Sequence, residues 1–131
     1  MSRTLAEWMK EITEWQDSIF TQATPLSAAI HLTREALEVQ QSVKLGEKGW
    51  ELDLELADVF LLTVGIAHLA GIDLEAAIDL KMFHNRNRTW GAPDADGVVE
   101  HVRGPKTLVE VFVFDSESEN LIKNIFMEDE K

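Results

Sequence analysis

The sequence of 131 residues contains no cysteine. This absence excludes a disulfide framework, a thiolate metal site and a cysteine nucleophile. It suits a reducing compartment, so we expect the protein in the cytoplasm. The N-terminal stretch also lacks the long apolar segment of a signal peptide.

Positive charge is scarce in this chain. Twelve Lys and Arg residues stand against 24 Asp and Glu residues, which gives a net charge of −12 at pH 7. A field of this sign repels nucleic acid backbones and anionic lipid. We therefore expect neither a nucleic acid polymer nor a membrane as a partner. A polyphosphate would be repelled as well, unless cations stood between it and the protein.

No apolar run is long enough to cross a bilayer. The most apolar stretch is Leu52–Ala70, and its unbroken apolar part begins only after Asp58. From Leu54 onward it is apolar on every side, which predicts a helix buried all round in a helical protein. Glu55 and Asp58 stand at its start. A buried, unpaired carboxylate is costly or changes its protonation, so a neutralising group is expected near both.

Hydrophobic spacing and capping residues predict an all-α core. Thr24 followed by Pro25 is typical of a helix start, and Gly46 is typical of a helix end. Asp73 is a candidate N-cap for a further helix. The predicted helices cover about Thr4–Phe20, Pro25–Val43, Trp50–Ala70 and Leu74–Thr89, and they form a four-helix bundle.

The pattern changes after the fourth helix. Trp90–Gly97 is rich in turn-forming residues and is predicted to be a loop. Val98–Arg103 and Thr107–Phe114 look extended, and Gly104 and Pro105 between them suggest a small β-hairpin. A short last helix is expected after this hairpin, with an apolar face formed by Leu121, Ile122, Ile125 and Phe126. We predict a single domain over residues 1–131, with its helical core at about 4–90 and the hairpin and tail at about 98–131.

Two pairs of acidic residues recur at helical spacing. Glu35 and Glu38 are three apart on the second predicted helix, and Glu55 and Asp58 are three apart on the third. Such pairs share a helix face, and a short loop makes the two helices antiparallel neighbours. The four carboxylates would then converge on one groove, where only cations stabilise them. Oxygen ligands favour Mg²⁺ or Mn²⁺.

These acids have two other interpretations. Glu35 and Glu38 alone fit a solvated helix face, although the apolar surroundings of Glu55 and Asp58 argue against this for the second pair. A di-iron bundle would use Glu-x-x-His on facing helices, and no histidine of the chain has a glutamate three residues before it.

The one concentrated basic patch lies on the fourth predicted helix. Lys81, Asn85 and Arg88 fall at i, i+4 and i+7, on one stripe of that helix. Lys and Arg suit the oxyanions of a polyphosphate, and Asn can bond a sugar or phosphate. The alternative is a basic last turn that offsets the helix dipole.

Three more polar or aromatic residues are candidates for substrate contacts. Gln16 lies on the apolar stripe of the first helix, either at the edge of the core or aimed into a pocket beside Trp15 as a stacking surface. His31 lies one turn before Glu35, where it can support that carboxylate or contact a substrate. His68 is expected to be structural.

These motifs together resemble the MazG-like all-α nucleoside triphosphate pyrophosphohydrolases. The match rests on ExxE at Glu35–Glu38, ExxD at Glu55–Asp58 and the downstream Lys, Asn and Arg. ELADVFLL and KMFHNRNRTWGAPDADGVVEHVR are especially similar to the phage-type dATP/dGTP diphosphohydrolase branch. The resemblance covers roughly Trp15–Arg103. One departure is Arg34, where the family often has a second glutamate, and we expect it to leave the metal cage intact.

The resemblance implies an enzyme that converts a dNTP, with a purine base, to dNMP and diphosphate and so controls a nucleotide pool. It implies two or three Mg²⁺ ions, with Mn²⁺ as a possible substitute, held by four acidic residues: Glu35, Glu38, Glu55 and Asp58. Glu38 would orient or deprotonate the attacking water.

Six further residues are then implied to contact the substrate: Lys81, Asn85, Arg88, Trp15, Gln16 and His31. The family assembles as homodimers or homotetramers, and for a phage protein the compartment is the host cytoplasm. The rival hypothesis is a non-catalytic helical oligomer whose acidic groove binds a metal or a basic partner.

Overall fold

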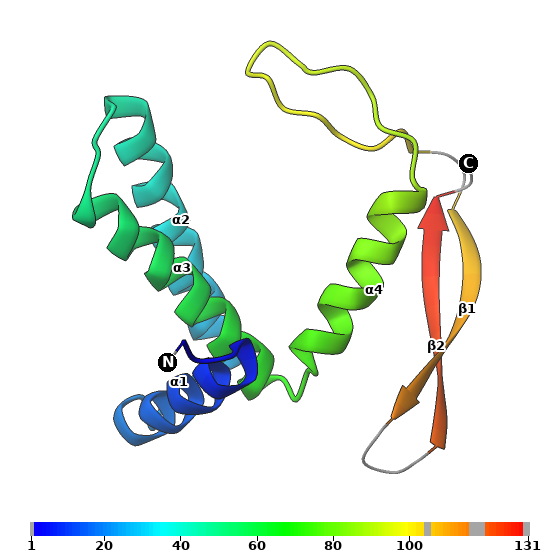
Figure 1. The fold of residues 1–131 in the computed structure, drawn as a ribbon, viewed down its shortest axis with the longest axis horizontal. Helices are drawn as coiled ribbons and strands as arrows, with labels where there is room; N and C mark the ends of the chain where they lie inside the picture. The colour runs from blue at the N-terminus through cyan, green and yellow to red at the C-terminus, as the bar shows by residue number, and fades with distance from the viewer. Residues whose placement is uncertain (1, 104–105, 116–119, 130–131) are drawn as a thin grey trace. The chain divides into compact units, whose positions relative to one another are not determined.

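The computed structural model describes residues 2–103, 106–115 and 120–129. In these residues it has four helices and two strands (Figure 1): α1 (Leu5–Ile19), α2 (Pro25–Leu45), α3 (Trp50–Leu69), α4 (Leu74–Asn87), β1 (Lys106–Asp115) and β2 (Asn120–Asp129). The predicted helical segments are confirmed to within two residues at each end. The chain divides into two compact units, one ending at Asp79 and the other beginning at Leu80.

The first two helices begin at capping boxes. Thr4 accepts a hydrogen bond from the backbone N–H of Glu7, and its own N–H donates to the Glu7 carboxylate at 2.7 Å. The Thr4 hydroxyl also donates to this carboxylate at 2.9 Å, and the hydrogen bonds from the backbone N–H and the hydroxyl of Thr4 lower the pKa of Glu7. Thr24 caps α2 in the same way with Ser27, and Pro25 follows at the first helical position.

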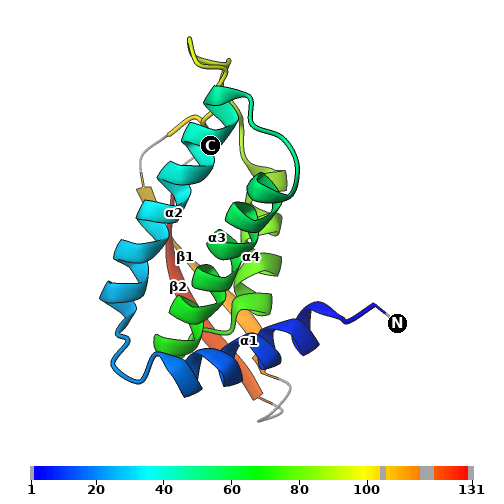
Figure 2. The same ribbon diagram turned by 90° about the vertical axis from the view of Figure 1, so that its left-hand side faces the viewer.

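Helices α2 and α3 pack against each other as an antiparallel pair (Figure 2). Gly46 ends α2 with φ of 72°, a left-handed conformation that glycine adopts without steric cost. Only residues 46–49 connect the two helices, so the chain reverses direction at once. Helix α1 also packs on α3. Residues far apart in the sequence are thereby placed around one groove.

Gly65 allows α1 to approach α3 closely. A Cβ atom at this position would lie 2.8 Å from Oε1 of Gln16, which is closer than real Cβ contacts allow. The Gln16 amide instead lies over the glycine, and its Nε2 donates to the carbonyl oxygen of Leu61 at 2.9 Å. This contact fixes the rotation of α1 against α3.

The fully buried apolar core is small. Among the described residues it consists of Ile12 on α1 and Val64 and Ala67 on α3. The expectation that α3 is buried all round is wrong for the single chain, because Leu54 and Leu56 are 54% and 52% exposed. Within the described part of its unit, α3 packs mainly against α1 and α2. Its other apolar side chains are partly or largely exposed, and Leu61, Leu62 and Ile66 are among the partly exposed ones.

In the described part of the chain, no single helix is both long and apolar enough to cross a membrane. Helices α3 and α4 match such a span only as a bent pair, and only by length and composition.

After α4, the second unit continues with a loop that closes on itself. Trp90 and His101 form an isolated antiparallel bridge, and the N–H of Gly91 donates to the carbonyl oxygen of Glu100 at 2.9 Å. At the tip, the Asp94 carboxylate accepts hydrogen bonds from the N–H groups of Asp96 and Val98. The predicted loop over Trp90–Gly97 is therefore the first part of a longer loop that the bridge between Trp90 and His101 closes.

Strands β1 and β2 pair antiparallel, from Lys106 opposite Asp129 to Asp115 opposite Asn120. The predicted partner strand is wrong, because Val98–Arg103 contains only the bridge at His101 and does not pair with β1. The predicted terminal helix is also wrong, since Asn120–Asp129 is a strand. The predicted turn at Gly104 and Pro105 lies outside the described residues.

The contact between Gly65 and Gln16 predicts that the effect of Gly65→Ala on stability depends on whether Gln16 is present. In a Gln16→Ala background, Gly65→Ala should stabilise the protein by about 0.5–1 kcal/mol, because alanine is the better helix former. With Gln16 present, the new methyl group displaces the amide and loses its hydrogen bond, which costs about 1 kcal/mol and cancels the gain. Urea unfolding of the four variants measures the coupling. A coupling of zero would contradict the described contact.

Candidate functional site

A cleft of about 710 Å³ lies in the first unit. Its walls come from the second half of α1, the loop after it, the first half of α2 and the part of α3 from Asp58 onward. Five of the residues predicted for the site line this one cleft: Trp15, Gln16, His31, Glu35 and Asp58. The structure therefore brings predicted substrate residues and predicted metal ligands together from three helices.

The two acidic pairs lie at one end of the cleft. Glu35 on α2 and Asp58 on α3 line it directly. Glu38 and Glu55 are not among its lining residues. Each lies one helical turn from its partner, toward the connection at residues 46–49, because α2 and α3 run in opposite directions. The two pairs are thus at matching levels of the two helices.

Glu55 carries the clearest signal for a cation. Its Oε2 atom is buried and has no hydrogen-bond partner among the described residues. A buried carboxylate oxygen without a donor is costly, and a divalent cation is the partner that its chemistry suits. The donor set therefore fits a hard cation.

The side chains of the four acidic residues are not arranged as a complete metal site in the described structure. No three His, Asp or Glu side chains in the described ranges are grouped closely enough to hold a metal ion. The assignment of Glu35, Glu38, Glu55 and Asp58 as joint ligands stays a prediction.

His31 supports one of these carboxylates. Its Nε2 lies 2.9 Å from Oε1 of Glu35, one turn further along α2, and both residues line the cleft. The Glu35 side chain is 16% exposed, whereas that of His31 is 56% exposed. The imidazole therefore holds the carboxylate in place from the more open side, as ligand-supporting residues do in metal sites.

The opposite end of the cleft has an aromatic wall. Trp15 on α1 and Phe20, just after α1, meet edge to face with their ring centroids 5.5 Å apart. Both line the cleft, beside Gln16. Their ring faces offer the kind of surface on which a planar base stacks.

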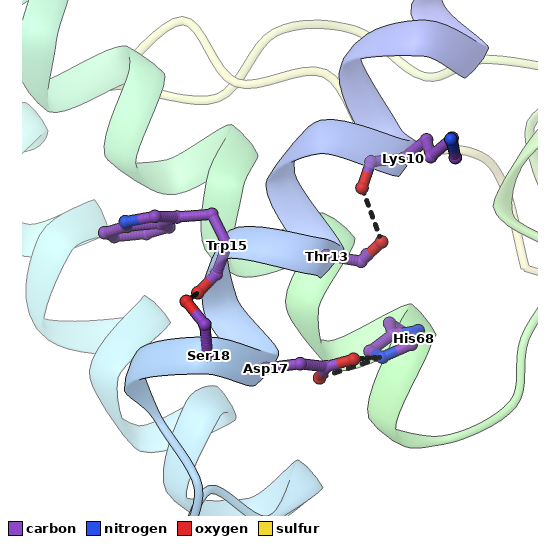
Figure 3. A network of polar contacts seen from close by, with 6 residues as sticks. All are labelled: Lys10, Thr13, Trp15, Asp17, Ser18 and His68. Atoms are coloured by element: carbon purple, nitrogen blue, oxygen red, sulfur yellow. Dashed lines mark hydrogen bonds and ion pairs between the residues drawn. The ribbon is translucent and has the colours of Figure 1, made fainter.

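A second polar contact ties α1 to α3 (Figure 3). His68, in the last turn of α3, places Nε2 at 3.0 and 2.9 Å from the two carboxylate oxygens of Asp17. The pair joins residues 51 positions apart, and both line the cleft. The structural role expected for His68 agrees with this contact. Together with the Gln16 amide, it holds the aromatic wall in place.

The predicted phosphate-binding stripe lies in the other unit. Lys81 and Asn85 are on α4, and Arg88 follows just after its end. The indole N–H of Trp90 donates to the backbone carbonyl of Asn85 at 3.0 Å. The side-chain Oδ1 of Asn85 is buried without a hydrogen-bond partner among the described residues. That this stripe reaches the carboxylates stays a prediction.

Sequence reasoning missed two charged residues of the cleft, Asp17 and Arg34. Arg34 was noted only as a departure from a family pattern. Its spacing of three residues from His31 would have placed it on the same face of α2. No local pattern marks Asp17, because its partner His68 comes from a distant part of the chain.

No protein-family model matches the chain. The chain is 32% identical over 107 residues to a dATP/dGTP diphosphohydrolase of Cyanophage S-2L, which covers 82% of this chain and 96% of that protein. It is 36% identical over 99 residues to a dATP/dGTP diphosphohydrolase of Salmonella phage PMBT28, over 76% of this chain. The match spans 32% of that longer protein.

A solved structure has a similar fold. It is the Cyanophage S-2L MazG-like pyrophosphohydrolase bound to dGDP and three catalytic Mn²⁺ ions per active site. The two structures superpose with a TM-score of 0.63 at 30% sequence identity, over 80% of this chain and 99% of the other.

The orphaned oxygen of Glu55 predicts how metal affects stability. Mn²⁺ should raise the melting temperature of the wild type, because an ion at 100 times its Kd adds about 2.7 kcal/mol of stability. Glu55→Gln removes a buried charge, so it should melt at or above the wild-type temperature without metal and lose most of the Mn²⁺-induced rise.

The matched control is Glu51→Gln, which changes an exposed acid in the first turn of the same helix. This variant should keep the full Mn²⁺-induced rise in melting temperature. Equal Mn²⁺ responses in the two variants, measured by differential scanning calorimetry, would exclude Glu55 as a ligand.

Proposed function

Because the chain belongs to the MazG-like nucleotide pyrophosphohydrolases, in the branch of the phage dATP/dGTP diphosphohydrolases, we propose that it hydrolyses dGTP or dATP. The products are the deoxynucleoside monophosphate and diphosphate. The observation that carries this proposal is the shared cleft, in which carboxylates of two helices and an aromatic wall surround one space. Such an enzyme controls a nucleotide pool in the cytoplasm of the host cell.

The polarity of the cleft gives the orientation of the substrate. The purine lies at the end with Trp15, Gln16 and Phe20, and the triphosphate lies at the end with Glu35 and Asp58. A purine has a large flat face for stacking on the aromatic side chains. The sugar lies between these two ends, where His31 lines the cleft.

The four acidic residues hold divalent cations, Mg²⁺ or Mn²⁺, in number two or three. When bound, these ions neutralise the phosphate charge and lower the pKa of a water molecule. Glu55 has the buried oxygen that needs such a partner. Glu35 is held by His31 in a fixed position before substrate arrives.

Glu38 is our choice for the residue that orients the attacking water and accepts its proton. The water oxygen forms a bond to the α-phosphorus, and the bond from the α-phosphorus to the bridging oxygen breaks. The leaving diphosphate carries away that electron pair. Lys81 and Arg88 bind phosphate oxygens, and Asn85 binds the sugar or the α-phosphate.

We also propose that the protein is a homodimer or homotetramer. Leu56 and Phe60 are 52% and 37% exposed, and they are one turn apart on the face of α3 opposite Asp58. Leu37 on α2 is 58% exposed. A second copy of the chain would bury these apolar side chains, which is the strongest driving force for association.

A substrate panel tests the activity. Incubated with each dNTP and Mg²⁺, the wild type should release monophosphate and diphosphate, fastest from dGTP or dATP. In H₂¹⁸O the label should enter the monophosphate, because water attacks the α-phosphorus. Glu38→Gln should lower kcat by about 100-fold or more, as loss of a general base does.

The control is Glu47→Gln, an exposed acid just after α2 that should leave kcat unchanged. Turnover of no dNTP, with Glu38→Gln behaving as the wild type does, would leave the non-catalytic helical oligomer as the answer.

Association is tested at the exposed face of α3. Leu56→Glu places a charge in the proposed interface, and it should shift the mass measured by size-exclusion chromatography with light scattering toward the monomer. Gln41→Glu adds the same charge at an exposed position of α2 and should leave the mass unchanged. A wild-type monomer at micromolar concentration would contradict the proposed assembly.

A further inference from the structure

Arg34 occupies a position in the cleft that the proposed chemistry does not yet use. It lies on α2, one turn after His31 and next to Glu35, and it lines the cleft. Among the described residues around the cleft, it is the only Lys or Arg. The three acidic lining residues are Asp17, Glu35 and Asp58.

The guanidinium is not engaged within the described part of the chain. The ion pairs of those residues leave Arg34 out, and no hydrogen bond to its side chain is present among them. Glu38 is four residues further on, a spacing at which a pair can form, yet the two are not within ion-pair distance. Glu35 is bonded to His31 instead. The side chain is exposed to solvent at the acidic end of the cleft.

We propose that Arg34 binds the triphosphate of the nucleotide, with its guanidinium on phosphate oxygens at the acidic end of the cleft. This inference rests on the proposed function and adds a contact that comes from the same unit as the carboxylates. Arginine offers two parallel N–H donors that match two phosphate oxygens. Because the chain carries a net charge of −12, a cation at this point offsets part of the repulsion of a polyanion.

The position is specific to phosphate and not to the base. The aromatic wall belongs to α1 and the segment after it, whereas Arg34 is beside Glu35 at the other end. A ligand without phosphate would fill the aromatic end alone. Loss of Arg34 should therefore weaken binding in proportion to the phosphates that a ligand carries.

The experiment measures Kd by titration calorimetry in the presence of Mg²⁺, for two ligands. One is a dGTP analogue with a non-hydrolysable bridge between the α- and β-phosphates, and the other is deoxyguanosine. Arg34→Gln should raise the Kd of the analogue by about 10- to 100-fold, the worth of a hydrogen bond to a charged group. It should leave the Kd of deoxyguanosine unchanged. Arg34→Lys keeps the charge but not the two parallel N–H donors, so it should bind the analogue more tightly than Arg34→Gln does but less tightly than the wild type.

Lys44→Gln is the matched control, since it removes the same charge from the last turn of α2, outside the cleft. It should change the Kd of the analogue by no more than about twofold, as expected for a distant surface charge. In steady state Arg34→Gln should raise KM for dGTP with little change in kcat.

Equal loss for both ligands would assign Arg34 a structural role, and no loss for either would also overturn the proposal. The test remains separate from the proposed activity. If the wild type hydrolyses no dNTP, the proposed function fails, while the binding comparison still decides the role of Arg34. Arg34→Lys, which keeps a good helix former at an exposed site, keeps the test valid if Arg34→Gln unfolds.

Discussion

A carboxylate oxygen that is buried in an apolar helix needs a cationic or hydrogen-bonding partner, and this need governs the site. Oε2 of Glu55 is in that position on α3. The antiparallel packing of α2 places a second acidic pair at the same level, with Glu35 braced by His31. In the proposed site, divalent cations would offset the repulsion among these acids. The most apolar helix of the chain therefore carries a buried carboxylate oxygen that has no partner among the described residues.

The cleft depends equally on how α1 is held against α3. Gly65 removes the side chain that would keep the two helices apart, and the Gln16 amide fills the space and bonds to Leu61. Asp17 and His68 add a second tie nearer the end of α3. With α1 fixed at these points, Trp15 becomes part of the cleft wall. These contacts and the small apolar core together position the part of the cleft wall that contains Trp15.

The sequence predicted most of the first unit because its signals are local. Thr24 and Gly46 act within one turn of the helix ends they mark, so the bounds of α2 could be predicted closely. The convergence of Glu35 and Asp58 on one cleft followed from a three-residue spacing and a short connection.

The C-terminal region could not be predicted in this way. Leu121, Ile122, Ile125 and Phe126 have the spacing of a helix face, yet their segment pairs with β1 as a strand. Strand pairing is not local, and it overrides helical propensity. Arg34 was missed for a related reason, since only the assembled cleft shows that its position faces a possible ligand.

We propose that α2 and α3 share divalent cations between their acidic pairs. Crystals grown with Mn²⁺ and a non-hydrolysable dGTP analogue, measured at the manganese absorption edge, test it directly. We expect anomalous peaks within coordination distance of carboxylates from both helices, with at least one oxygen of Glu55 or Asp58 and one of Glu35 or Glu38 sharing an ion. Ions coordinated by residues of one helix alone, or no anomalous peak at these four residues, would contradict the proposed shared site.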